Sequence, residues 1–287
     1  MVRDFTVRKY QEMCRSIEKS GYKTITVSDY LKNNSKYDNS KFIIIRHDID
    51  NKVDLPTALK MAEYEKSLGI RATYYFRMVR DTYDTELIKT IYNLNHEVGY
   101  HYEVLNESKG DINKAVDLFT HNLDEFRKLV PVTSICQHGG SLGDDTASSV
   151  KGMLLTSWKL LRGKKELIAY RSNDIWQHEK YEDYNLLGEA YLSLDFDKIL
   201  YLSDTGLSWD GYENRVLDVI NTDYYKEKKQ IVRTTDDLIN LINKGQYSKI
   251  NLLVHPANWI DPLIPWLKWR SLQYFRNYGK RIFIKPS

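Results

Sequence analysis

The sequence predicts an α/β protein built on a parallel sheet, and three observations support this class. Phe42–Ile45 holds consecutive large apolar residues, which is typical of a strand buried on both faces, as in parallel sheets. Strand-like and helix-like segments then alternate at lengths that suit right-handed crossovers. No linker or repeat divides the 287 residues. We therefore expect a helical lead-in over 1–40 and one domain over 41–287, a barrel rather than two domains.

The elements follow in order from apolar spacing and turn residues. Asp54 and Pro56 open the first helix of the domain, and Gly69 ends it. The clearest helix is Asp111–Val130, whose apolar residues recur at steps of three and four. The other expected segments are strands at Arg71–Arg77, Glu97–Tyr102, Val132–Gln137, Leu167–Arg171, Ile199–Ser203 and Ile250–Val254, and helices at 87–94 and Asp236–Lys244.

Composition argues against several classes of function. Lys and Arg number 42 against 39 Asp and Glu, and a net charge of +3 does not favour nucleic acid as a partner. Cys14 and Cys136 are the only cysteines, which argues against a disulfide scaffold or a cysteine-based zinc site. Met1–Tyr10 has charge and no apolar segment, so we expect no secretory signal. A cytoplasmic protein is expected.

Titratable residues follow several of the expected strands. They are His47, Asp48, Asp50, His101, Glu103, His138 and His255. Because the carboxyl ends of parallel strands meet at one edge of a sheet, we expect these side chains to share a site. Carboxylates that lie close together repel unless a proton or a cation lies between them. The pattern therefore indicates a metal site or an acid–base site.

Three further residues are candidates for the same edge. Asp204 and Trp209 follow a late strand, and Trp259 follows the last one. Asp204 also suits a turn before Gly206, and both interpretations stay open. The chain has 22 Tyr and 6 Trp, which suit either ordinary packing or stacking on sugar faces. Together with Glu103, we take Asp204, Trp209 and Trp259 as candidate substrate-binding residues.

Short motifs resemble those of the polysaccharide deacetylases, carbohydrate esterase family 4. They are Arg46–Asp50 (RHDID), His96–His101 (HEVGYH) and Leu252–Pro256 (LLVHP). With Ala72–Phe76 (ATYYF), the first is similar to an R-H-D-V-D branch found among surface-polysaccharide biosynthesis proteins. The resemblance covers residues 40–140 and the surroundings of His255. It implies a distorted (β/α)7 barrel that removes N-acetyl groups from sugars with one divalent metal ion.

The resemblance also implies roles for individual residues. Asp48 would be the general base, His255 the general acid, and Asp50 and His101 ligands of the metal. Carboxylate and imidazole ligands suit Zn²⁺ first, with Co²⁺, Ni²⁺ or Mn²⁺ as alternatives. The family's second histidine ligand falls at Leu105, which cannot bind a metal.

The third ligand must therefore come from elsewhere or be absent. We prefer His138, because it follows the next strand and the glycines after it allow a close approach of the backbone. Glu103 is the alternative. His96 opens its strand, away from the edge, and is expected to be structural.

The expected function is removal of an N-acyl group, in the first place N-acetyl, from a sugar of a surface polysaccharide or its precursor. The alternative is a degenerate barrel that binds a glycan or has an accessory role without catalysis, and Leu105 supports it. A nucleotide-sugar transferase is disfavoured because only about 40 poorly patterned residues precede Asp48. A phosphatase of the haloacid dehalogenase type is disfavoured by Lys52, where Thr or Val is needed.

The C-terminal segment Trp259–Arg281 is aromatic and basic. It suits a last helix that packs by its aromatic side. The alternative is peripheral contact with an anionic membrane, which would place the protein at the inner membrane face.

Overall fold

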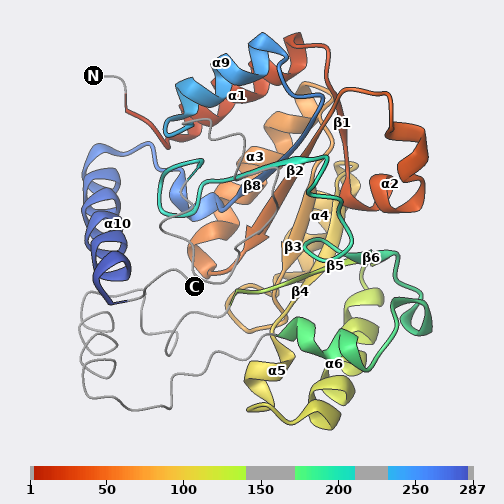
Figure 1. Cartoon of the computed structure of the whole chain (residues 1–287). Helices are drawn as coiled ribbons and strands as arrows, with labels where there is room; N and C mark the ends of the chain where they lie inside the picture. The colour runs from red at the N-terminus through yellow and green to blue at the C-terminus, as the bar shows by residue number, and fades with distance from the viewer. Residues whose placement is uncertain (1–2, 140–171, 211–231, 284–287) are drawn as a thin grey trace.

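The structure, a computed structural model, describes residues 3–139, 172–210 and 232–283 and confirms the α/β class (Figure 1). Its strands are β1 Lys23–Ile25, β2 Phe42–Ile49, β3 Thr73–Phe76, β4 Glu97–Tyr102, β5 Ser134–Gln137, β6 Gly188–Glu189, β7 Leu200–Ser203 and β8 Lys249–Val254. Its α-helices are α1 Val7–Lys19, α2 Val27–Lys32, α3 Leu55–Ser67, α4 Thr85–Asn93, α5 Val104–Glu107, α6 Ile112–Arg127, α9 Thr235–Lys244 and α10 Leu263–Phe283.

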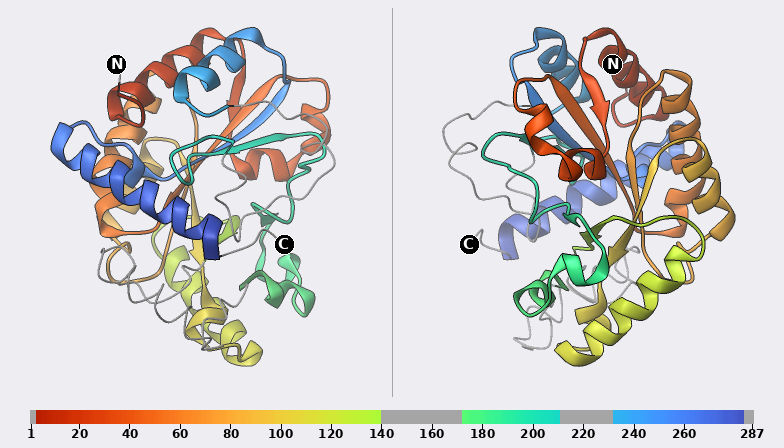
Figure 2. Two further views of the ribbon diagram at one scale, coloured as in Figure 1. Left: turned by 60° about the vertical axis from the view of Figure 1, so that its left-hand side comes forward. Right: turned by 90° about the vertical axis from the view of Figure 1, so that its right-hand side faces the viewer.

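Every strand pair in this sheet is parallel, and β2 lies near its centre. The order is β6-β5-β4-β3-β2-β8-β7, with β1 also paired to β2. Along one edge of β2, the first half of the strand pairs with β1, where Ile44 lies opposite Ile25. The second half pairs with β3, where Arg46 lies opposite Thr73. The sheet curls into a half-barrel, with helices along its outer face (Figure 2). The expected parallel sheet is therefore confirmed.

Most of the expected elements are present within a few residues of their expected bounds. Strand β1 lies inside the segment expected as a helical lead-in, so residues 1–40 contribute to the same sheet. Strand β6 lies in a region where the sequence pattern predicts no element. The strand expected at Leu167–Arg171 lies outside the described residues. Among the described helices, none is long and apolar enough to cross a membrane.

The two faces of β2 enter different apolar layers. Ile43 and Ile45 belong to the larger layer, which α1, α3, α4, α6 and α9 cover. Phe42 and Ile44 belong to a smaller layer on the inner face, which includes residues of α2. Because successive side chains of a strand point to opposite faces, the carboxylates of the following residues continue the inner face. The candidate site therefore lies above the smaller layer.

Candidate metal centre and acid–base site

Asp50, His101 and His138 form a compact triangle at the carboxyl edge of the sheet. Asp50 follows β2, His101 lies near the end of β4, and His138 directly follows β5. Asp50 Oδ1, His101 Nε2 and His138 Nδ1 are 3.2 Å apart in each of the three pairs. The structure thus brings the preferred third residue to the two others.

The hydrogen bonds of this triangle fit a bound cation. His101 Nδ1 lies 3.0 Å from the carbonyl oxygen of Cys136, which can only accept, so in a neutral ring Nε2 carries no proton. Asp50 Oδ1 is buried without a hydrogen-bond partner. Burial acts against ionisation of Asp50, but the positive charges of His138 and His101 in their protonated forms outweigh it and hold its pKa well below the usual range, an effect that a cation bound between these residues would share.

The size of the triangle also fits. Ligand atoms about 2.0–2.1 Å from a tetrahedral zinc ion lie about 3.3–3.4 Å from each other. The three atoms therefore match one face of such a tetrahedron, and Asp50, His101 and His138 could hold a divalent ion.

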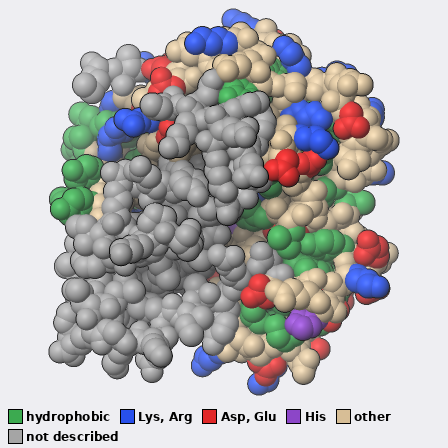
Figure 3. All heavy atoms as spheres, in the orientation of Figure 1, with side chains coloured by type: hydrophobic (Ala, Val, Ile, Leu, Met, Phe, Trp, Pro, Cys, Tyr) green, Lys and Arg blue, Asp and Glu red, His purple; other side chains and the backbone are tan. Residues whose placement is uncertain are grey.

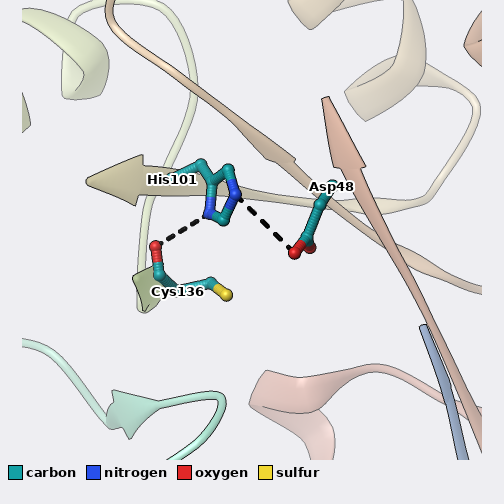
Figure 4. A group of neighbouring side chains, drawn as sticks. All are labelled: Asp48, His101 and Cys136. Carbon is teal, nitrogen blue, oxygen red and sulfur yellow. Dashed lines mark hydrogen bonds and ion pairs between the residues drawn. The ribbon is translucent and has the colours of Figure 1, made fainter. Parts of the chain in front are cut away.

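A second group of side chains shares His101 (Figure 4). Asp48, His101 and Cys136 also have ligand atoms within 4.8 Å of one another. However, burial raises the pKa of the Cys136 thiol well above its usual value, which disfavours the thiolate that binds metals. Asp48 is also paired with an arginine already. The group that contains Asp50 is therefore the better cation site.

Asp48 is held by Arg46, which lies two positions earlier and hence on the same face of β2. Arg46 Nε is 3.1 Å from Asp48 Oδ1, and a terminal nitrogen donates to Oδ2 at 3.2 Å. The guanidinium also donates to Tyr191 Oη at 2.5 Å and lies over the Tyr191 ring, 4.2 Å from its centroid. Arg46 is 0% and Asp48 2% exposed. Pairing offsets the cost of burying either charge alone.

His255 approaches the triangle from β8. Its Nε2 lies 3.8 Å from Asp50 Oδ2, and its Nδ1 lies 2.6 Å from Asp204 Oδ1. Asp204 is fully buried, and its Oδ2 also accepts from the backbone N–H of His255 and from Trp259 Nε1. Burial acts to lower the pKa of His255, but Asp204, followed by Asp50 and Asp48, raises it to about 10. His255 is therefore an imidazolium at neutral pH.

Two buried side chains fix the backbone around Asp50. Asp54 accepts from the Asp50 backbone N–H at 3.1 Å and from that of Ala257 at 2.6 Å, which ties the end of β2 to the turn after β8. Arg77 donates to the Asp50 carbonyl at 2.7 Å and to Glu103 at 2.6 Å. Glu103 thus contacts Arg77 rather than the triangle, and the structure does not support it as the alternative third ligand.

His47 lies on the opposite face of β2, away from the other titratable residues of the motif. Its Nε2 is 2.8 Å from Glu65 Oε1. Tyr10 and Tyr74 also donate to Glu65, and His96 Nδ1 lies 3.6 Å from it. We call these five buried residues the Glu65 cluster. They connect α1 and α3 to the sheet, which agrees with the structural role expected of His96.

Three predicted residues lie deeper than a substrate-contacting role requires. Trp209 is 0% and Trp259 1% exposed, so neither ring offers a face to a sugar; their indole N–H groups donate to Thr235 and Asp204. Leu105 packs in the larger apolar layer. Asp204 is bonded to the ring and the backbone N–H of His255 and so holds that histidine in place. Two surface hollows of about 400 and 530 Å³ are lined by other residues.

Arg46 and Tyr191 are among the site residues that sequence reasoning missed, as are Asp54 and Arg77. The signal for Arg46 is its spacing of two from Asp48 within one strand, which places both on one face. Tyr191 follows β6 in a region without periodic pattern, and no sequence signal points to its contact with Arg46.

The chain matches no family model and no curated protein. Solved structures that resemble it include a mutant of a CE4 family pseudoenzyme with restored enzymatic activity, at 14% identity and a TM-score of 0.39, covering 84% of this chain and 64% of that one. The wild-type pseudoenzyme from Bacillus anthracis gives 16% identity and a TM-score of 0.38, covering 75% and 64%. The chain thus spans just under two thirds of their length. At these values the likeness supports no conclusion about the activity of this chain.

Proposed function

We propose that the protein is a metal-dependent hydrolase that removes an N-acyl group, in the first place N-acetyl, from a sugar of a surface polysaccharide or its precursor. The observation that carries this proposal is the convergence of three kinds of group at one edge of the sheet. A ligand triangle, a paired carboxylate at Asp48 and an imidazolium at His255 lie side by side. Amide hydrolysis needs an activated carbonyl, a base for the attacking water and an acid for the leaving amine.

Asp50, His101 and His138 would hold the ion. The chemistry supplied there by a bound divalent ion, zinc in the first place, is Lewis acidity toward the amide carbonyl. The chain itself contributes the orientation of the ligands. Arg77 and Asp54 fix the backbone of Asp50, so the ligand does not need to reorganise when the ion binds.

The proton transfers are assigned to the two groups beside the triangle. Asp48 accepts the proton of the attacking water, and Arg46 fixes the position of its carboxylate. His255 donates its Nε2 proton to the departing amine, while Asp204 holds the ring by Nδ1. Asp48 thus takes one proton from water, and His255 gives a different proton to the amine.

The experiment that tests the proposal combines metal content with product release. Wild type and the variants Asp50→Ala, His101→Ala and His138→Ala are analysed by metal mass spectrometry after incubation with zinc. His121→Ala is the control, because His121 is an exposed histidine on α6. We expect about one ion per chain in wild type and control and loss in the other three.

Acetate release from N-acetylated oligosaccharides is then measured with the loaded protein. Release by wild type that disappears in Asp48→Asn, with the ion retained, supports the assignment. A wild type that binds no ion would overturn the metal centre. A loaded protein that binds the oligosaccharide and releases no acetate would favour the glycan-binding alternative, which the absence of a ligand at Leu105 supports.

A further inference from the structure

Six large apolar residues of helix α10 lie on its exposed side. They are Leu263 (54% exposed), Ile264 (65%), Leu267 (48%), Tyr274 (69%), Phe275 (60%) and Tyr278 (59%). At 3.6 residues per turn these six residues fall within an arc of about 120° on the helix. We call this arc the α10 apolar face. Figure 3 shows hydrophobic side chains gathered at the edge of the molecule where α10 lies.

The opposite side of α10 contacts the rest of the protein through polar atoms. The contacts are Trp266 Nε1 to the Asp4 carbonyl at 2.7 Å, Trp269 Nε1 to Asn258 Oδ1 at 3.1 Å, and Asn277 Nδ2 to the Gly206 carbonyl at 2.8 Å. A helix that covers a core normally turns its apolar side inward and its polar side outward. In α10 two tryptophans and an asparagine make hydrogen bonds inward, and the six residues of the α10 apolar face point outward.

Helix α10 is also strongly basic. Its 21 residues include Lys268, Arg270, Arg276, Lys280 and Arg281, and no Asp or Glu. Lys268 and Arg270 are exposed, and on the helical projection they lie on either side of the α10 apolar face. Arg270 also lies over the Trp266 ring, 5.3 Å from its centroid. An apolar arc is thus bordered by cations on both sides.

We propose that the α10 apolar face docks on an anionic lipid membrane, with the helix lying in the plane of the headgroups. Exposed aromatic and aliphatic residues between cations are the pattern of helices that lie at a membrane interface. The absence of acidic residues from α10 makes an anionic surface the complementary partner. A second copy of the chain is a poorer occupant, because it would bring two cationic helices together without a counter-charge.

Docking at this face has a geometric consequence for the candidate site. Trp269 of α10 donates to Asn258, which lies in the turn after β8, and Asn277 of α10 donates to the carbonyl of Gly206, which lies in the turn after β7. The same turns carry His255 and Asp204. Helix α10 is therefore fixed against the edge of the sheet that holds the site, and docking brings that edge close to the lipid headgroups.

Vesicle co-sedimentation of the full chain tests this inference, and it does not depend on any enzymatic activity. The probes are vesicles of phosphatidylcholine alone and of phosphatidylcholine with phosphatidylglycerol. We expect sedimentation with the anionic vesicles only, weakened by added salt. The double variant Tyr274→Ser/Phe275→Ser should bind about tenfold more weakly or worse, because two rings no longer enter the interface.

The matched control is Val53→Ser/Tyr92→Ser, which removes two exposed apolar residues from other parts of the surface and should bind as wild type does. Lys268→Glu/Arg270→Glu should abolish the preference for anionic vesicles. Wild type that stays in the supernatant with both kinds of vesicle would overturn the proposal. So would a dimer in sedimentation velocity that dissociates in Tyr274→Ser/Phe275→Ser while vesicle binding is absent, because the face would then bind a second copy.

Discussion

The Glu65 cluster predicts a large loss of stability from a small chemical change. In Glu65→Gln the side chain keeps its size, but the buried carboxylate that accepts from Tyr10, Tyr74 and His47 becomes a neutral amide. One of its two oxygens is replaced by a donor that faces other donors. Removing one partner of a buried charged network costs about 3–5 kcal/mol, and we expect a decrease of this size in the free energy of unfolding.

Urea unfolding at neutral pH measures this decrease. Glu63→Gln is the matched control, because Glu63 is exposed on the same helix two positions away and should change stability by about 0.5 kcal/mol or less. Metal content should be the same in both variants, since His47 and Glu65 lie on the face of β2 opposite the triangle. Equal stability of the two variants would refute the interpretation of the cluster as a stabilising network.

The pH dependence gives a second check on Glu65. Burial acts to raise its pKa, but His47 and His96 outweigh it and lower the pKa below 4.5. A carboxyl whose pKa is lowered by folding contributes stability that is present above the unfolded value and is lost as the pH falls through the folded value. The difference between wild type and Glu65→Gln should therefore be largest at neutral pH and shrink below about pH 4.5.

Three further predictions concern the site and its supporting strands. Asp204→Asn should lower the pKa of His255 from about 10, which moves the alkaline limb of the kcat profile to lower pH; an unchanged limb would contradict it. Gly99→Ala should destabilise by about 1–3 kcal/mol or more in urea unfolding, because the added carbon would lie 2.3 Å from the Tyr75 ring and 2.8 Å from a backbone carbonyl; wild-type stability would show that the ring can move. Cys136→Ala should retain the bound ion, and its loss would favour the second ligand group.

The sequence predicts the core of the sheet because apolar periodicity and strand order act together. The run that forms β2 has no polar residue before Arg46, and it is buried along its whole length. Once the strands are parallel, residues that follow them must meet at one edge. This is why Asp50, His101, His138 and His255 could be grouped before their distances were known.

The burial of a side chain near a strand end, and the residue that it contacts, could not be predicted in the same way. Trp209 and Trp259 follow strands just as the site histidines do, yet their rings pack against each other in the core, with centroids 6.0 Å apart. Position along a strand does not tell whether a side chain rises above the edge or sinks below it. The contact of Arg46 with Tyr191 joins residues far apart in the sequence, and only the folded chain specifies it.

Successive side chains of β2 alternate between the two faces of the sheet, so the fold and the site both depend on the pairing register of this one strand. The side chains of Ile43, Ile45 and His47, at odd positions, point toward the larger apolar layer. Those of Arg46 and Asp48, at even positions, point toward the inner face of the sheet. Deleting one residue early in β2 would reverse every later side chain. Asp48 would then meet the aliphatic layer, Ile49 would take its place on the inner face, and Asp50 would turn away from His101 and His138. Because such a shift ruins packing and chemistry together, the chain cannot fold in that register and retain a partly working centre.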